Sequence, residues 1–174
     1  MTDKDQRRFP IGPFEPRSGF TPEERQGFIA EIEALPGSIR KLVSDLPEDV
    51  LDRPYRDGGW TVRQVVHHIP DSHLQGYIRF KLALSEDVPT IKTYVQAAWG
   101  EMEDARSGPV EPSLALLDGL HRRWGFFLRT VSEEDFRRTY RHPDMGELSL
   151  ETTLQLYAWH GRHHLGHIRL VVGR

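Results

Sequence analysis

The chain has 174 residues, of which 37% are hydrophobic and 28% charged, a composition typical of one globular domain with its own core. The net charge of −3 gives no basic field for nucleic acid, and the lack of cysteine excludes disulfides, thiolate metal sites and a cysteine nucleophile. No apolar run is long enough for a membrane span, and the N-terminus lacks the apolar stretch of a signal peptide, so we expect a cytoplasmic protein without membrane contact.

The first predicted helix begins at Thr21. This residue, with Pro22 and Glu24, provides a capping hydroxyl, a proline in the first turn and the acidic partner of a capping box. Apolar residues then recur at helical spacing as far as Val43. Pro36 lies within this run and is expected to kink or split the helix. We expect residues 1–8 to be a flexible extension of a single domain over residues 1–174.

A second helix is predicted from Thr61, where Gln64 completes another capping box, toward Leu84. Pro70 interrupts its pattern, and a bend there is expected to free the carbonyl of Val66. The preceding residues 46–59 contain prolines and glycines and are predicted to be a connection.

Two more helices complete the predicted fold. Residues 86–112 are interpreted as a long connection with one short helix, followed by a helix over 113–131. Residues 132–148 are polar and predicted to hold a short turn, and a last helix is predicted over 150–172. No alternation of apolar and polar residues supports a sheet. The fold class is therefore all-α, a four-helix bundle with one long connection and kinks near Pro36 and Pro70.

Nine histidines are present, and seven of them fall in two clusters, one on each of two predicted helices. On the last helix, His160 and His164 stand one turn apart, as do His163 and His167. Histidines at this spacing share one face, so both imidazoles can reach one ion. A helical wheel places His160 and His164 on the flank of the apolar face and His163 well away from it.

The same wheel on the second helix places His68 nearer the core and His67 on the far side. His73 falls among the core residues, although Pro70 makes its register uncertain. Histidine pairs with this spacing are common in helices, and buried histidines with a purely structural role show the same pattern. The spacing alone therefore leaves a metal site and a structural role open.

The sequence also resembles a known family, the YfiT branch of the DinB/YfiT-like superfamily. The likeness extends from about Phe9 to Leu170. The segments that carry it are Pro54 to Ile69, Asp71-Ser72-His73, Tyr77 to Leu82, Trp159-His160, His163-His164 and His167-Ile168.

This resemblance implies a four-helix bundle, a homodimer and one divalent metal ion held by three histidines. The family's first ligand lies eight residues after a helix-leading tryptophan, which corresponds to His68 after Trp60. The other two form a pair one turn apart on the last helix, matching His160 and His164. Pro70 departs from the family pattern and leaves His67 as the alternative to His68.

Three neutral imidazoles leave coordination positions open, as catalytic sites do. Zinc is the expected ion, and nickel, copper or cobalt suit the same ligands. An open position can hold a water that becomes a nucleophile, or a small-molecule thiol that the metal deprotonates. The family resemblance includes both metal-dependent hydrolases and bacillithiol S-transferases.

We favour the S-transferase, with a metal-dependent hydrolase and a non-catalytic metal-binding protein as alternatives. Asp71 is the nearest acidic residue to His68, and the wheel turns it away from the predicted site, so no general base is apparent. Four arginines are candidates for binding an acidic substrate: Arg56, Arg63, Arg79 and Arg106. Trp60 and Trp159 are interpreted as core or interface residues.

Overall fold

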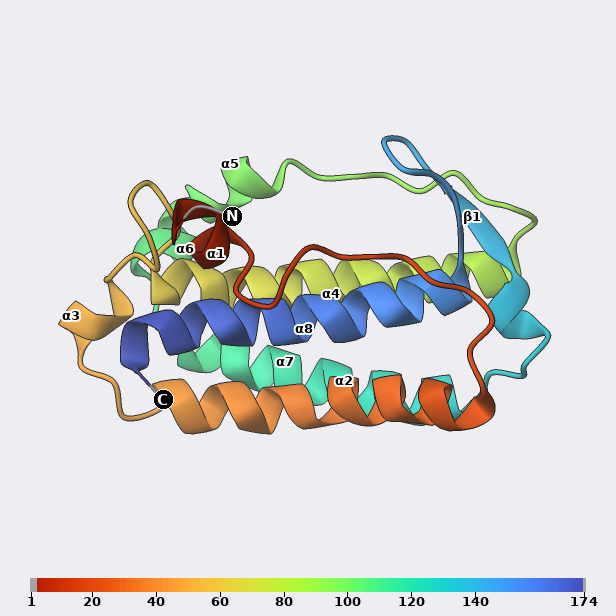
Figure 1. Ribbon diagram of the computed structural model, residues 1–174, viewed down its shortest axis with the longest axis horizontal. Helices are drawn as coiled ribbons and strands as arrows, with labels where there is room; N and C mark the ends of the chain where they lie inside the picture. The colour runs from red at the N-terminus through yellow and green to blue at the C-terminus, as the bar shows by residue number, and fades with distance from the viewer. Residues whose placement is uncertain (1–2, 174) are drawn as a thin grey trace.

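The computed structural model describes residues 3–173 of the chain, and four long helices lie side by side in it (Figure 1). Each of α2 and α4 packs against both α7 and α8. The predicted four-helix bundle is confirmed. The long helices are α2 (Pro22–Val43), α4 (Val62–Ser85), α7 (Glu111–Thr130) and α8 (Leu150–Val172).

The helix starts follow from side-chain caps that the sequence announces. Thr21 and Thr61 each accept a hydrogen bond from the backbone N–H three residues on, and each capping box is complete. Ser149 caps α8 in the same way, and Gly173 ends this helix in the left-handed conformation. These caps satisfy backbone groups that would otherwise lack partners.

Both internal prolines lie within continuous helices. α2 runs through Pro36 and α4 runs through Pro70, so neither helix is split. A proline has no N–H, and the carbonyl four residues earlier therefore loses its helical partner. For Pro36 this carbonyl belongs to Ile32.

The connections hold more regular structure than the sequence predicted. The segment between α2 and α4 contains α3 (Glu48–Leu51), and the long connection contains two short helices, α5 (Gln96–Gly100) and α6 (Glu103–Ser107). Residues 132–148 form the 3-10 helix η1 (Asp135–Arg137) and most of an antiparallel hairpin. Its strands are β1 (Thr139–His142) and β2 (Gly146–Ser149). Strands of four residues are too short to show alternation clearly, so this hairpin was missed.

The N-terminal segment lies outside the bundle and runs along α8 (Figure 1). Asp3–Arg8 forms α1, which contacts α8. Farther along, the Gln155 amide of α8 bonds to the backbone of Glu15 and Arg17. The expected flexibility of residues 1–8 stays a prediction, and residues 1–2 lie outside the described part. No helix in that part combines the length and apolarity that a membrane crossing requires.

A candidate metal centre between α4 and α8

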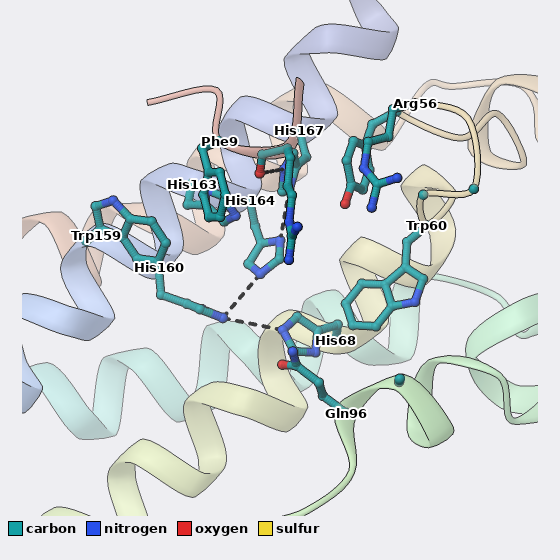
Figure 2. Close-up of a pocket in the computed structure, with 15 residues that line it drawn as sticks. Phe9, Arg56, Trp60, His68, Gln96, Trp159, His160, His163, His164 and His167 are labelled. Atoms are coloured by element: carbon teal, nitrogen blue, oxygen red, sulfur yellow. Dashed lines mark hydrogen bonds between the residues drawn. The ribbon is translucent and has the colours of Figure 1, made fainter. Parts of the chain in front are cut away.

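The bundle brings three histidines together at one point (Figure 2). His68 projects from α4, and His160 and His164 project from α8. The Nε2 atom of His160 lies 3.3 Å from Nε2 of His68 and 3.2 Å from Nε2 of His164. One ligand nitrogen from each of the three residues falls within 4.8 Å of the others.

These separations fit one divalent ion. A tetrahedral ion with metal–nitrogen bonds of about 2.0–2.1 Å holds its ligand nitrogens about 3.3 Å apart. Burial lowers the pKa of His68 to about 4 and lowers the pKa of His160 and His164 well below the usual value. The three rings are therefore neutral at pH 7, which is the form that binds metal.

Hydrogen bonds determine which nitrogen of His160 carries its proton. A backbone carbonyl only accepts, so Nδ1–H of His121 donates to the Ile32 carbonyl at 2.5 Å. Nε2 of the neutral His121 then accepts from Nδ1–H of His73 at 3.0 Å. Nε2 of His73 in turn accepts from Nδ1–H of His160 at 3.1 Å. This sequence of bonds, the inner relay, leaves the lone pair of His160 on Nε2, facing His68 and His164.

The carbonyl that anchors the inner relay is the one that Pro36 leaves without a helical partner. Because Pro36 cannot donate, the Ile32 oxygen is available to a side chain from outside α2. His121 on α7 is fully buried and supplies that donor. His121 on α7 thus supplies the hydrogen bond that Pro36 removes from α2.

A second, shorter series of bonds ends at the N-terminal segment and constitutes the outer relay. Nε2–H of His167 donates to the carbonyl of Arg8 at 3.2 Å. Nδ1 of His167 then accepts from Nδ1–H of His164 at 3.3 Å. The lone pair of His164 is therefore also on Nε2. Both relays place an acceptor for the Nδ1–H of a candidate ligand on its outer side, as partners of metal-binding histidines commonly do.

The remaining histidines of the two clusters lie elsewhere. His67 bonds to Ser113 Oγ and to the Gly108 carbonyl, so the structure brings His68 rather than His67 to the pair on α8. His163 is buried, although the wheel turns it away from the core. The reason is that Phe9 of the N-terminal segment covers this face of α8, and Trp159 stacks on the His163 ring.

A cavity of about 510 Å³ opens onto the three histidines (Figure 2). Trp60 and Trp159 line it, rather than serving only as core or interface residues. Arg8 and Arg56 add positive charge to its wall, and no Asp or Glu occurs among its lining residues. The full lining is Arg8, Phe9, Tyr55, Arg56, Gly58, Gly59, Trp60, His68, Gln96, Ala97, Trp159, His160, His163, His164 and His167.

The other residues considered from the sequence have different surroundings. Arg63 is buried in ion pairs with Glu48 and Asp52 and has a structural role. Arg106 is exposed and faces Glu101 at 3.6 Å. Asp71 does not line the cavity, and burial, assisted by Asp104, raises its pKa to about 6.

Comparison with known families agrees with this architecture. A profile described as the DinB superfamily matches residues 31–168. The chain belongs to the DinB superfamily. This result confirms the resemblance that the histidine and tryptophan motifs indicated.

Relatives within the superfamily carry a provisional assignment of activity. A Bacillus cereus (strain ZK / E33L) protein is 52% identical over 161 residues, covering 92% of each chain, and is named provisionally as a metal-dependent hydrolase. A Bacillus anthracis (strain CDC 684 / NRRL 3495) protein with the same designation is 51% identical over 161 residues, again covering 92% of each chain. These names support a metal-dependent enzyme in general terms.

Two solved structures share the fold. YfiT from Bacillus subtilis, described as a probable metal-dependent hydrolase with an unusual four-helix bundle topology, matches with a TM-score of 0.91 and 44% identity, covering 94% of each chain. The four-helix bundle protein TT2238 matches with a TM-score of 0.56 and 21% identity, covering 81% of this chain and 94% of its own. The second likeness concerns the fold alone.

Sequence reasoning missed the relay residues His73, His121 and His167 as parts of the centre. One signal was available for His73, which falls on the apolar face of its wheel, where a polar ring needs a buried partner. For His121, the spacing to Leu117 and Trp124 places it on the buried stripe of α7. The identity of the partners could not be read, because two of them are backbone carbonyls.

Proposed function

We propose that this DinB-superfamily chain is a metal-dependent enzyme whose ion is held by Nε2 of His68, His160 and His164. The observation that carries the proposal is the convergence of these nitrogens, with separations of 3.2 and 3.3 Å from His160. The two relays support it, because they direct the lone pairs of two rings toward the same point. The lone pairs of His160 and His164 at this distance repel each other unless a positive charge lies between them.

Zinc is the ion we propose, since imidazole ligands and a nearly tetrahedral spacing suit it, and nickel is the next candidate. When bound, a divalent ion with three imidazole ligands supplies Lewis acidity that lowers the pKa of a coordinated thiol or water. The chain's own residues supply the rest. The relays hold protons on Nδ1 of His160 and His164, and Trp60 and Trp159 provide apolar walls of the cavity.

We propose S-transfer as the reaction, with a small-molecule thiol as the nucleophile and an electrophilic carbon as its target. A sulfur–carbon bond forms, the bond from carbon to the leaving group breaks, and the leaving group departs with the electron pair. The thiol proton is released beside the thioether and the leaving group. The lining of the cavity favours this reaction over hydrolysis, because no carboxylate there is placed to take a proton from water.

Hydrolysis is the second candidate, and the names of the relatives favour it. Proteins more than half identical to this chain are designated metal-dependent hydrolases. The same three histidines would serve that reaction. The two candidates differ in whether turnover requires a thiol.

An activity comparison tests the proposal. The full chain, loaded with zinc, is supplied with monochlorobimane in the presence and absence of bacillithiol or cysteine, and separately with nitrophenyl acetate. We expect thiol-dependent formation of the bimane adduct and ester cleavage no faster than in buffer. His68→Ala should abolish adduct formation, whereas His67→Ala, one residue away and outside the cavity, should retain it.

Other outcomes assign the other functions. Cleavage of the ester without thiol, lost in His68→Ala, would replace the transferase by the hydrolase. One equivalent of bound zinc with no turnover of any substrate would leave a non-catalytic metal-binding protein.

A further inference from the structure

A second cavity, of about 520 Å³, lies on the other side of His160. It shares His160, Gln96 and Ala97 with the cavity described above, so the two spaces adjoin at the candidate metal centre. The connection from α4 to α5 provides one wall, and α4, α8 and the hairpin provide the others. Figure 1 shows this connection running back along the bundle.

Arg79 on α4 is the cation of this second cavity. Its exposed fraction is only 8%, and it forms no ion pair with any residue that the structure describes. Nη1 donates to the Tyr157 hydroxyl at 3.2 Å. Nε is buried and has no hydrogen-bond partner within the described chain. The guanidinium therefore has one recorded hydrogen bond and no carboxylate partner within the described chain.

The surroundings of Arg79 do not neutralise its charge. Tyr157, Tyr140 and Tyr94 carry phenol hydroxyls near it, and burial raises the pKa of all three, so all three are neutral. Asp144 is the acidic residue among those lining the cavity, but its side chain is 78% exposed and lies 4.0 Å from Nδ1 of His142. A buried guanidinium without a counter-ion is costly, and an anionic ligand would remove that cost.

The paired arginines of the chain give a useful contrast. Arg25 is buried to a similar degree, and its guanidinium faces Glu151 at 3.1 Å. Arg63 is also buried, and two carboxylates neutralise it. Arg79 differs from both by facing a cavity in place of an acidic side chain.

We propose that the second cavity binds a carboxylate group of the substrate, with the guanidinium of Arg79 as its cation and principal donor. The planar guanidinium matches the geometry of a carboxylate, and charge-assisted bonds of this type are among the stronger ones in proteins. The inference rests on the proposed function in one respect: it places the rest of the carboxylate-bearing molecule beside His160. The substrate class is therefore a small acidic molecule whose reactive group reaches the histidines.

The test measures carboxylate binding without metal or turnover. Zinc is removed with phenanthroline, since the usual chelators are themselves carboxylates, and succinate is titrated while the arginine Nε–H signals are followed by nitrogen-15 NMR. We expect one buried Nε–H signal to shift on saturation, and that signal to be missing in Arg79→Lys. Succinamide, which has the same length without the charge, should cause no shift.

The variants locate the site. Arg79→Lys keeps the charge and loses Nε, and Arg79→Met loses both, so each should weaken succinate binding about tenfold or more. Arg56→Gln removes one of the two arginines of the other cavity and should leave the affinity within about twofold. Thermal unfolding of each variant establishes that it is folded before its affinity is measured.

Three results would overturn the proposal: unchanged affinity in a folded Arg79 variant, a larger loss in Arg56→Gln, or no succinate binding to the native protein. None of them depends on whether the histidines hold a metal. Failure of the metal centre would conversely leave succinate binding to Arg79 intact.

Discussion

Each of the two relays fixes the proton of one candidate ligand on Nδ1, but the relays are built from different parts of the molecule. The inner relay passes through His73 and His121, both fully buried between long helices, and ends on a carbonyl within α2. The outer relay has one intermediate, His167, and ends on the carbonyl of Arg8, an exposed residue of the N-terminal segment. Buried residues of the bundle therefore orient His160, whereas the N-terminal segment orients His164.

The two relays should therefore contribute differently to the stability of the fold and to metal binding. A defect in the inner relay leaves buried donors or acceptors without partners, which weakens the fold as well as the site. Removing the N-terminal segment uncovers His167 of the outer relay, so water can replace the lost partner and the cost falls mainly on the site. Substitutions that break one relay at a time measure this contrast.

The largest effect is expected where both relays converge. His68→Ala, His160→Ala and His164→Ala each remove a proposed ligand, so each should weaken zinc binding by more than the roughly 10–100-fold typical of outer partners. His163→Ala should retain one equivalent, because His163 lies beside the set and outside it. Metal content by mass spectrometry after dialysis checks this. Full occupancy in any of the first three would disprove the ligand assignment.

Acid should destabilise both relays together. Burial lowers the pKa of His68, His121, His163 and His167 from 6.5 to about 4. The unfolded chain therefore binds more protons than the folded chain between these values, and stability is lost as the pH falls through that window. Urea unfolding of the metal-free protein at pH 7, 6, 5 and 4 measures the trend. A constant free energy of unfolding across the series would contradict the burial of neutral rings.

Breaking the inner relay should affect both the metal and the fold. His121→Phe keeps an aromatic ring but leaves the Ile32 carbonyl and Nδ1–H of His73 without partners. We expect zinc affinity to fall about 10–100-fold and stability to fall by about 1–3 kcal/mol. Nitrogen-15 shifts of His160 in the metal-free protein should change from the Nδ1–H form to a mixture of tautomers.

His67→Phe is the matched control for that variant. His67 also bonds to a backbone carbonyl, and it lies outside both relays. Its loss should lower stability without changing zinc affinity or the His160 shifts. Equal zinc affinities in the two variants would show that the inner relay does not position His160.

Breaking the outer relay should have the smallest effect. Deleting residues 1–8 removes the carbonyl that accepts from His167, and we expect zinc affinity to fall about tenfold with little change in the urea midpoint. Arg8→Ala keeps that carbonyl and should bind zinc as the native chain does. A titration against a competing chelator compares the two. A larger loss of affinity here than in His121→Phe would reverse the order of the relays.

The extent to which sequence anticipated the molecule follows the range of the interactions involved. The helix starts at Thr21 and Thr61 depend on residues three positions apart, and the sequence contains them. The pair His160 and His164 is likewise one turn of one helix. These features could be predicted because they are local.

The relays could not be predicted, because each step joins separate elements at a register that only packing fixes. His121 meets His73 across 48 positions, and His167 meets Arg8 across 159. The wheel placed His163 on an outer face for the same reason. A wheel describes one helix and does not include the N-terminal segment, which covers this face of α8. The second cavity depends on the course of residues 93–97, which carry no periodic signal.

The proline of α2 also sets a limit on how this chain can be improved. A search for stabilising substitutions would select Pro36→Ala. Alanine has a high helix propensity and would supply the missing backbone hydrogen bond within α2. The restored N–H would compete with His121 for the Ile32 oxygen, which three hydrogen bonds connect to His160. A gain in thermal tolerance at Pro36 would thus be obtained at the expense of proton placement on a proposed ligand. Pro36 should therefore be kept when the chain is engineered for stability, although we do not place it in contact with substrate or metal.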